Sequence, residues 1–428
     1  MKKPKLVGVL VLVGCLVTYL MVVKHHYTTL KPDTHRLPPY RPPALMNHSF
    51  RYGIMFDAGS TGTRVHIFKF QMGHDEAPKL VQETFRAIKP GLSAYADDPD
   101  QCKSGIVELL EVAKGSVPQS VWSSTPVVLK ATAGLRLLPG EKAQHLMDQV
   151  RSLFLVSPFL SREDSVSIMD GTDEGISAWI TVNFLTGGLH SANSNTVGVL
   201  DLGGGSTQIT FSPQDEKTIQ VSPVDYIRSF QMFNSTHTVY THSYLGLGLM
   251  SARLAVLGGV HVPSPEGSTE LISPCLAPGY SGSWEHADVV YTVKGQKEGQ
   301  SAYEACRSRV QKVLHGEVLK VPEAAAGEFY AFSFYYDRAV DLGVIDEKEG
   351  GSIKVDDYIS AAKRVCGRLS VTPPQSPFFC LDLVYISVLL QDLGFPGNKQ
   401  FKLVRTIDQV ETSWALGATF HYIDSLKS

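Results

Sequence analysis

Two glycine-rich turns, each opened by an aspartate and each flanked by apolar runs, constrain the fold of this chain more than any other feature. The motif DAGSTGTR at 57–64 follows the apolar run 52–56 and leads into the run 65–70. The motif DLGGGSTQ at 201–208 lies in the same way between the run 196–200 and another short strand-like run. Apolar runs separated by a glycine-rich turn are typical of a β-hairpin. The sequence therefore predicts two similar strand–turn–strand units, one in each half of the chain.

The chemistry of both turns suits a bound polyphosphate. Glycine lets backbone N–H groups crowd around an anion, and Ser and Thr hydroxyls add further donors. Neither turn is a Walker-type loop, which would have the pattern G-x-x-x-x-G-K-[ST] and a following helix. One such turn alone is most often structural, but two of them favour a ligand gripped from both sides. The expected phosphate-binding residues are Ser60, Thr61, Gly62, Gly203, Gly204 and Gly205, joined by Thr132 from the motif ATAGLR at 131–136.

The aspartates that open the turns, Asp57 and Asp201, are candidate ligands of a divalent cation. Ca²⁺ and Mg²⁺ prefer oxygen ligands, which they reach directly or through bound water. Capping of the turn is the structural alternative for each aspartate. Arg64 and Lys130 are candidate ion partners nearby. The chain contains no H-E-x-x-H, G-x-S-x-G or EF-hand pattern, which argues against the catalytic classes that depend on those motifs.

Glu174 is the candidate general base. It follows the predicted strand 166–169 in the segment DGTDEG and precedes a predicted helix. The positive end of that helix would keep the carboxylate ionised. Asp173 is the nearest rival, and capping of the helix is the ordinary structural alternative. Ser206 and Gln208 are expected to orient the attacking water that hydrolysis of a phosphoanhydride requires.

The N-terminus predicts a membrane anchor. Residues 1–5 contain three lysines and residues 6–23 contain no charged side chain. An apolar run of this length can just span a bilayer, and the preceding positive charge favours a cytoplasmic tail. A cleaved signal peptide is the alternative. Residues 24–50 are rich in proline, histidine and tyrosine without an apolar period, so a stalk is expected there. The net charge of −3 argues against a nucleic-acid partner.

Sequons and cysteines indicate that the part of the chain after the predicted span lies in an oxidising compartment where proteins are glycosylated. The N-x-[ST] pattern predicts glycosylation of Asn47 and Asn234. The six cysteines show no zinc-binding spacing. Pairing of neighbours in sequence predicts the disulfides Cys275–Cys306 and Cys366–Cys380, with buried free thiols as the alternative. Cys102 would then remain unpaired.

Apolar periodicity predicts several further elements. Helices are expected over 105–114, 141–154, 176–185 and 410–426, and a strand over 126–131. The turn-rich segment 258–300 is expected to be an insertion. The aromatic run FYAFSFYY at 329–336 is either core or a surface on which a nucleobase stacks, and Tyr335 and Tyr336 are the candidates for stacking.

Taken together, the motifs DAGSTGTR, ATAGLR, DGTDEGISAW, DLGGGSTQI and SWALGA, in this order, resemble the nucleoside triphosphate diphosphohydrolase (apyrase) family over roughly residues 50–425. The resemblance implies an α/β fold of two actin-like, ribonuclease-H-type domains with the active site in the cleft between them. The first domain is expected to comprise 51–171 and 406–428, and the second 172–405 with its insertion. The single N-terminal span is similar to that of the Golgi and secreted branch.

The resemblance also implies an activity. Relatives of this branch hydrolyse nucleoside diphosphates, with GDP, IDP and UDP preferred, and depend on calcium or magnesium. The family pattern assigns the base to Glu174, water positioning to Ser206 and Gln208, and water-mediated cation binding to Asp57 and Asp201. It favours a monomeric type II Golgi membrane protein with a lumenal catalytic body, or a form shed to the cell surface or medium. The alternatives are a kinase or exopolyphosphatase of the same fold, and a nucleotide sensor or chaperone without fast turnover.

Overall fold

The computed structural model describes Thr18 and residues 49–73, 78–189, 195–259, 269–287, 289–297 and 301–426. The chain divides into two units, Met1–His48 and Ser49–Ser428, and the second contains every element considered below. The predicted span 6–23, apart from Thr18, lies outside the described residues, as does Asn47. Within the described residues, no helix has the length and apolar character needed to cross a bilayer.

The first sheet contains the first predicted hairpin at its centre. Its strand order is β3-β2-β1-β4-β5, with β1, β2 and β3 antiparallel and β4 and β5 parallel to β1. The strands are β1 (Ser49–Ala58), β2 (Thr63–Met72), β3 (Lys79–Ile88), β4 (Val127–Ala131) and β5 (Val166–Ile168). Because successive side chains of a strand face opposite sides, Ile54 and Phe56 enter one core while Met55 enters another.

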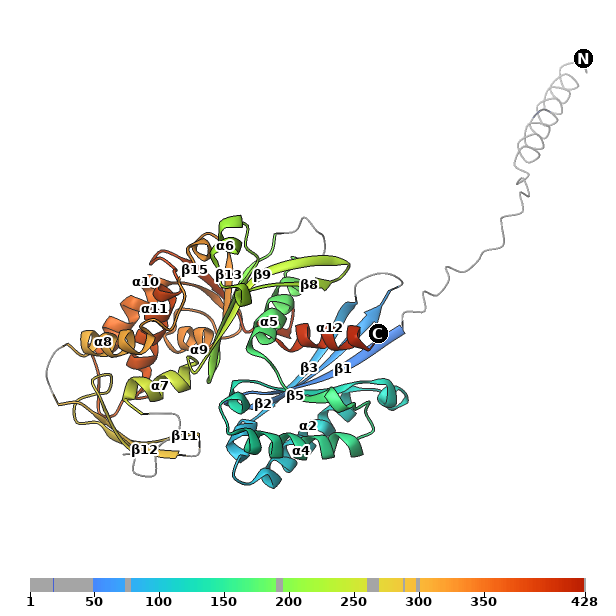
Figure 1. Ribbon diagram of the computed structural model, residues 1–428, viewed down its shortest axis with the longest axis horizontal. Helices are drawn as coiled ribbons and strands as arrows, with labels where there is room; N and C mark the ends of the chain where they lie inside the picture. Colours follow the sequence, from blue (N-terminus) through green and yellow to red (C-terminus); the bar gives the residue numbers. More distant parts are fainter. Residues whose placement is uncertain are drawn as a thin grey trace, which may run out of the picture. The chain divides into compact units, whose positions relative to one another are not determined.

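Two amphipathic helices cover one face of this sheet. They are α2 (Cys102–Ser116) and α4 (Gly140–Val156), and they lie side by side below the strands in Figure 1. Their buried residues recur at three- and four-residue intervals, as in Ile106, Leu109, Leu110 and Ala113 of α2. The helices predicted at 105–114 and 141–154 are therefore confirmed.

The second sheet contains the second hairpin and repeats the central arrangement of the first. Its order is β14-β15-β13-β6-β7-β9-β8, with β6 and β7 antiparallel and β13 parallel to β6. Its strands are β6 (Gly198–Leu202), β7 (Ser206–Phe211), β8 (Ile227–Met232), β9 (Ser235–Leu245), β13 (Phe329–Ser333), β14 (Gly351–Lys354) and β15 (Gln400–Leu403). The triplet β13-β6-β7 thus corresponds to β4-β1-β2.

A pair of packed helices lies between the two sheets. Helix α5 (Gly171–Leu185) packs against β6, β7 and β9, whereas α12 (Ala415–Ser425) packs against α5 and β1 (Figure 1). A Cβ atom at Gly417 would lie 2.1 Å from the Ser177 carbonyl oxygen, so the two helices can approach this closely only with glycine there. The C-terminal helix thus contacts β1 of the first sheet as well as α5, and the expected domain split remains a prediction.

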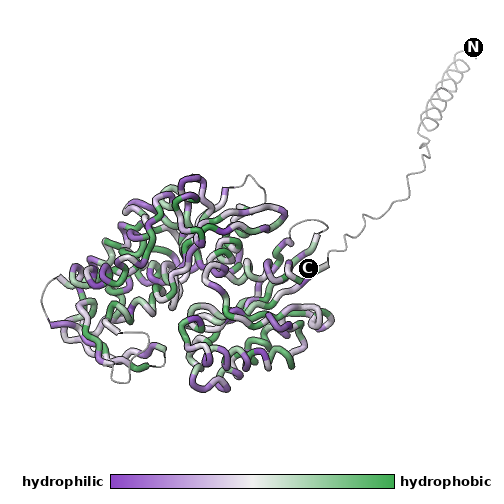
Figure 2. Tube along the Cα trace, in the orientation of Figure 1, coloured by the Kyte–Doolittle hydropathy of each residue, from purple (hydrophilic) through white to green (hydrophobic). Residues whose placement is uncertain are grey.

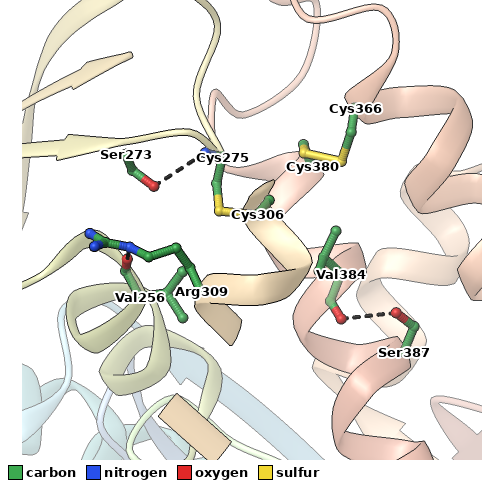
Figure 3. Close-up of a disulfide and its surroundings, with 9 residues drawn as sticks. All are labelled: Val256, Ser273, Cys275, Cys306, Arg309, Cys366, Cys380, Val384 and Ser387. Atoms are coloured by element: carbon green, nitrogen blue, oxygen red, sulfur yellow. Dashed lines mark hydrogen bonds between the residues drawn. A yellow bond between two sulfur atoms is a disulfide. The ribbon is translucent and has the colours of Figure 1, made fainter. Parts of the chain in front are cut away.

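The second sheet packs against a layer of helices on its other face. They are α7 (Leu249–Leu257), α8 (Ala302–Leu314), α9 (Phe334–Asp341), α10 (Val355–Cys366) and α11 (Phe379–Asp392). Apolar stretches, green in Figure 2, follow these central strands and helices and form the largest core cluster. Both predicted disulfides are confirmed: Cys275–Cys306 ties the insertion to α8, and Cys366–Cys380 joins α10 to α11 (Figure 3). Cys102 is buried and unpaired.

Three elements differ from the sequence prediction. Helix α5 begins at Gly171 rather than 176, because the Asp170 side chain accepts a hydrogen bond from the Thr172 N–H and caps the helix there. The C-terminal helix begins at Ala415 rather than 410, because Val410–Glu411 forms β17 and pairs with β16 (Thr406–Ile407). The insertion contains a small sheet of β10 (Glu270–Ser273), β11 (Ser281–His286) and β12 (Val289–Gly295).

Candidate active site

The two glycine-rich turns face one cavity of about 490 Å³. Gly59, Ser60 and Thr61 line it from the β1–β2 turn, and Gly203, Gly204, Gly205 and Ser206 line it from the β6–β7 turn. A Cβ atom at Gly204 would lie 2.4 Å from the Ser60 hydroxyl, so glycine is needed there because the turns touch. The structure therefore brings together the two segments that the sequence predicted to share a ligand.

The remaining predicted phosphate residues divide into two groups. Thr132 lines the cavity and is buried. Gly62 is not among the lining residues; its carbonyl accepts a hydrogen bond from the Gly59 N–H at 3.0 Å and closes the turn. Gly62 therefore shapes the turn, and its expected direct contact with phosphate finds no support in the geometry.

Each aspartate is the second-to-last residue of its strand, β1 or β6, and both are buried. Arg64 Nη1 donates to Asp57 Oδ2 at 2.9 Å, whereas Asp57 Oδ1 is buried without a hydrogen-bond partner. Ser333 Oγ donates to Asp201 Oδ1 at 2.6 Å. Burial raises the pKa of Asp201 to about 6, and this rise is opposed by the Ser333 hydrogen bond and increased by the Asp57 carboxylate.

These two carboxylates fit a divalent cation. A buried carboxylate oxygen without a hydrogen-bond partner is unfavourable. Two carboxylates that face the same cavity also repel each other, unless a cation or bound water compensates their charge. Among the described residues, no group of three or more His, Cys, Asp or Glu side chains is arranged around a metal position. Asp57 and Asp201, with bound waters completing the shell, are therefore the residues that would hold the ion.

Glu174 lies in the first turn of α5, on the cavity wall, with 7% of its surface exposed. The Arg136 guanidinium forms a short ion pair with Glu174 Oε2, and Gln208 Nε2 donates to the same oxygen at 3.2 Å. Gln208 Nε2 also contacts Ser206 Oγ at 2.9 Å. The three predicted catalytic residues thus form one hydrogen-bonded cluster. Gln208 lies beneath the cavity surface rather than on it.

The helix N-terminus does not by itself hold the pKa of Glu174 at its ordinary value. Burial raises the pKa of Glu174 to about 8; Arg136 opposes the rise, and the carboxylates of Asp201 and Asp57 add to it. The rival base, Asp173, is exposed and does not line the cavity. Glu174 therefore remains the base candidate, with a proton affinity set mainly by burial.

Both tyrosines proposed for stacking are buried in the core of the second sheet, but only one of them lines the cavity. The Tyr335 side chain is buried in the core of the second sheet and does not line the cavity, so its expected stacking on a nucleobase is wrong. Tyr336 does line the cavity, and its hydroxyl donates to the Glu347 carbonyl. Successive residues of α9 point in directions about 100° apart, which explains why only one of the two reaches the cavity.

Several residues that line the cavity or contact its lining were missed or given no role by sequence reasoning. Arg136 was visible only as the last letter of ATAGLR, and nothing in that motif predicts its pairing with a glutamate 38 positions later. Lys130 instead donates to Ser167 and does not line the cavity. Further lining residues are Phe85, Lys89, Ser333, Phe334, Asp337, Arg405, Glu411 and Trp414.

Comparison with known proteins places this chain among nucleoside phosphatases. Residues 44–428 match the GDA1/CD39 (nucleoside phosphatase) family. Ectonucleoside triphosphate diphosphohydrolase 6 of Mus musculus is 60% identical over 384 residues, covering 90% of this chain and 84% of that protein. The Homo sapiens protein of the same name is 58% identical, covering 90% and 79%. Nucleoside diphosphate phosphatase ENTPD5 of Homo sapiens is 51% identical, covering 90% of each chain.

A solved structure supports the fold. The nucleoside triphosphate hydrolase from Neospora caninum matches with a TM-score of 0.61, covering 89% of this chain and 93% of that one, at 14% identity. At this identity the likeness concerns the fold alone, and it agrees with the predicted α/β, actin-like architecture. The family match and the relatives at 51–60% identity lead to one conclusion: this chain is a member of the GDA1/CD39 family and an enzyme that hydrolyses nucleoside phosphates.

Proposed function

We propose that this protein hydrolyses nucleoside diphosphates, with GDP, IDP and UDP preferred, to the monophosphate and inorganic phosphate. The observation that carries the proposal is the single cavity in which two phosphate-binding turns meet the hydrogen-bonded cluster of Glu174, Ser206 and Gln208. The printed name of the 51% identical human relative, a nucleoside diphosphate phosphatase, supports diphosphates as substrates.

In the proposed mechanism, backbone N–H groups of both turns and the Ser60 and Thr61 hydroxyls hold the phosphate chain. Glu174 accepts a proton from the water that attacks the terminal phosphorus, and Ser206 orients that water. Gln208, predicted to orient the water as well, acts from beneath the cavity surface by holding Ser206 and Glu174. Arg136 stays beside Glu174 and balances its charge when the carboxylate is ionised. A calcium or magnesium ion near Asp57 and Asp201 would neutralise charge on the phosphate oxygens.

A carboxylate and a guanidinium that line the cavity support the proposed preference for guanine, hypoxanthine and uracil nucleotides. Asp337 and Arg405 both line the cavity with exposed side chains. Guanine, hypoxanthine and uracil each present a ring N–H beside a carbonyl, which matches one acceptor and one donor. Adenine lacks that ring N–H. Replacement of Asp337 by Asn should therefore narrow the ratio of GDP to ADP turnover about threefold, whereas an unchanged ratio would remove Asp337 from base selection.

We further propose a monomeric type II Golgi membrane protein, anchored by residues 6–23, with a secreted or cell-surface form as the alternative. Two disulfides support an oxidising compartment. Asn234 supports it as well, because it is exposed in the turn between β8 and β9 and accessible to glycosylation.

The deciding experiment measures phosphate release by residues 48–428 secreted from a eukaryotic cell. GDP, UDP, IDP, ADP, GTP and ATP are each tested with calcium, magnesium or EDTA. Cation-dependent release that is fastest from GDP, IDP or UDP is expected. Release that survives excess EDTA would contradict the cation requirement. Nucleotide binding without release would instead favour a nucleotide sensor.

A further inference from the structure

Ser333 has an unusual backbone conformation at the edge of the cavity. It joins β13 to α9, and its φ of 57° and ψ of −129° lie in a region that residues with a Cβ atom rarely adopt. Such conformations persist only where the surrounding structure holds them, and they cluster at functional sites. Ser333 also lines the cavity.

The Ser333 hydroxyl is aimed at a cation-binding candidate. In the parallel pairing of β13 with β6, Phe332 lies opposite Asp201 and Ser333 lies opposite Leu202, one residue beyond it. From that position Ser333 Oγ donates to Asp201 Oδ1 at 2.6 Å, a distance typical of a charge-assisted hydrogen bond.

The donor to Asp201 differs in charge from the donor to Asp57. Asp57 is paired with the guanidinium of Arg64, which already compensates much of its charge. Among the described residues, Asp201 forms no ion pair within 4.0 Å, and its carboxylate is held by the neutral hydroxyl. A hydroxyl fixes the orientation of a carboxylate without neutralising it, so the full negative charge remains available to a cation.

The start of α9 is anchored firmly enough to maintain the unusual conformation. Arg338 of α9 donates to Asp382 at 3.0 Å, and Arg253 of α7 donates to the same buried carboxylate at 2.7 Å. The Tyr358 hydroxyl donates to the Tyr335 carbonyl at 2.6 Å. These buried contacts hold the helix from two sides immediately after Ser333.

We propose that Ser333 is a positioning residue that holds Asp201 in the orientation required to bind the divalent cation. This inference rests on the proposed function, since it concerns the cation of that reaction. The strained backbone is the cost of directing the hydroxyl at Asp201 from the end of β13.

The test compares Ser333→Ala, which removes the hydroxyl, with Ser333→Gly, which removes the hydroxyl and also relieves the backbone strain. The first measurement is phosphate release from GDP as a function of Ca²⁺ or Mg²⁺ concentration. Both variants should need about tenfold more cation for half-maximal rate, because a hydrogen bond to a charged group is lost. The maximal rate at saturating cation should stay within about threefold of the wild type.

A second readout does not depend on turnover. In the Glu174→Gln background, the rise in melting temperature produced by cation plus GDP should require about tenfold more cation when Ser333 is Ala or Gly. The Gly variant should melt at the same temperature as the Ala variant or higher, since glycine tolerates a positive φ. Ser212→Ala, which removes a hydroxyl bonded to the Thr238 carbonyl outside the cavity, is the matched control.

The outcomes separate the two proposals. If the wild type releases no phosphate in a cation-dependent way, the proposed function fails. If the wild type is active but the cation dependence of both variants stays within about twofold of it, the role of Ser333 is refuted. A fall in maximal rate with unchanged cation dependence refutes it equally.

Discussion

The two hairpins share one backbone frame but use it differently. Residue pairing aligns Asp57 opposite Arg64 in the first hairpin and Asp201 opposite Gln208 in the second. The turns close with equivalent hydrogen bonds, from the Gly59 N–H to the Gly62 carbonyl and from the Gly203 N–H to the Ser206 carbonyl, each at 3.0 Å. Arg64 thus corresponds to Gln208, and Gly62 corresponds to Ser206.

This correspondence shows how a repeated frame acquires two tasks. In the first hairpin, the residue facing the aspartate is a cation that pairs with it at 2.9 Å. In the second, the corresponding glutamine turns away from the aspartate and donates to Glu174 and Ser206. The aspartate of the first hairpin therefore has its charge largely balanced, whereas that of the second has no ion pair among the described residues, and the second hairpin is instead bonded to Glu174.

The largest effect is expected from removing the base that the second hairpin supports. Glu174→Gln should lower kcat by at least about 100-fold, because a positioned base contributes roughly 10²–10⁴. GDP affinity, measured by calorimetry in the presence of the cation, should change less than about threefold. Near-normal phosphate release by this variant would show that Glu174 is not the base.

The same variant tests the protonation of Glu174 by its effect on stability. With a folded-state pKa near 8 and an ordinary value of 4.5, the wild type takes up a proton on folding between these pH values. Its stability should therefore fall as pH rises through that window, by up to about 1.4 kcal/mol per pH unit. Glutamine does not titrate, so the melting temperature of Glu174→Gln minus that of the cation-free wild type should increase from pH 5 to pH 8. A constant difference would contradict the raised pKa.

The ion pair of the first hairpin should matter most when no cation is bound. Arg64→Gln leaves the buried Asp57 without compensation, so unfolding by urea should require about 1–2 kcal/mol less free energy in EDTA. Added calcium should restore part of this loss. Arg86→Gln is the control, since its ion pair with Glu108 is exposed and its loss should cost less than about 0.5 kcal/mol. Equal losses in the two variants would show that the Asp57–Arg64 pair contributes no more to stability than an exposed ion pair does.

Among the predicted losses of turnover in the second hairpin, the smaller one is expected at Gln208, the residue that corresponds to Arg64. Gln208→Ala should lower kcat about tenfold, because Glu174 and Ser206 lose the hydrogen bonds that align them. A tenfold loss corresponds to an increase of about 1.4 kcal/mol in the activation free energy. Phosphate-release kinetics should show little change in KM. Gln231→Ala on the edge strand β8, which loses only an exposed hydrogen bond to Thr236 of β9, should behave as the wild type. A higher KM with normal kcat would assign Gln208 to substrate binding instead.

Much of the fold was predictable because it follows from local patterns. The period-two strands around both turns and the amphipathic helices α2 and α4 appear close to their predicted places. The start of α5 was missed by five residues because the Asp170 cap falls in a segment without apolar periodicity. The last helix was predicted too long because the pairing of β17 with β16 is invisible in the apolar pattern.

The sequence by itself determined which residues have the chemistry for the site: two aspartates, two glycine-rich turns, Glu174, Ser206 and Gln208. Those choices lie in short motifs, where residue type and local spacing carry the information. Only the tertiary structure decided that Arg136 pairs with Glu174, that Ser333 donates to Asp201, and that Tyr336 lines the cavity whereas Tyr335 does not. These contacts join residues on different elements. The raised pKa of Glu174 likewise depends on burial and on the charges of Arg136, Asp201 and Asp57 from other parts of the chain, which no local pattern encodes.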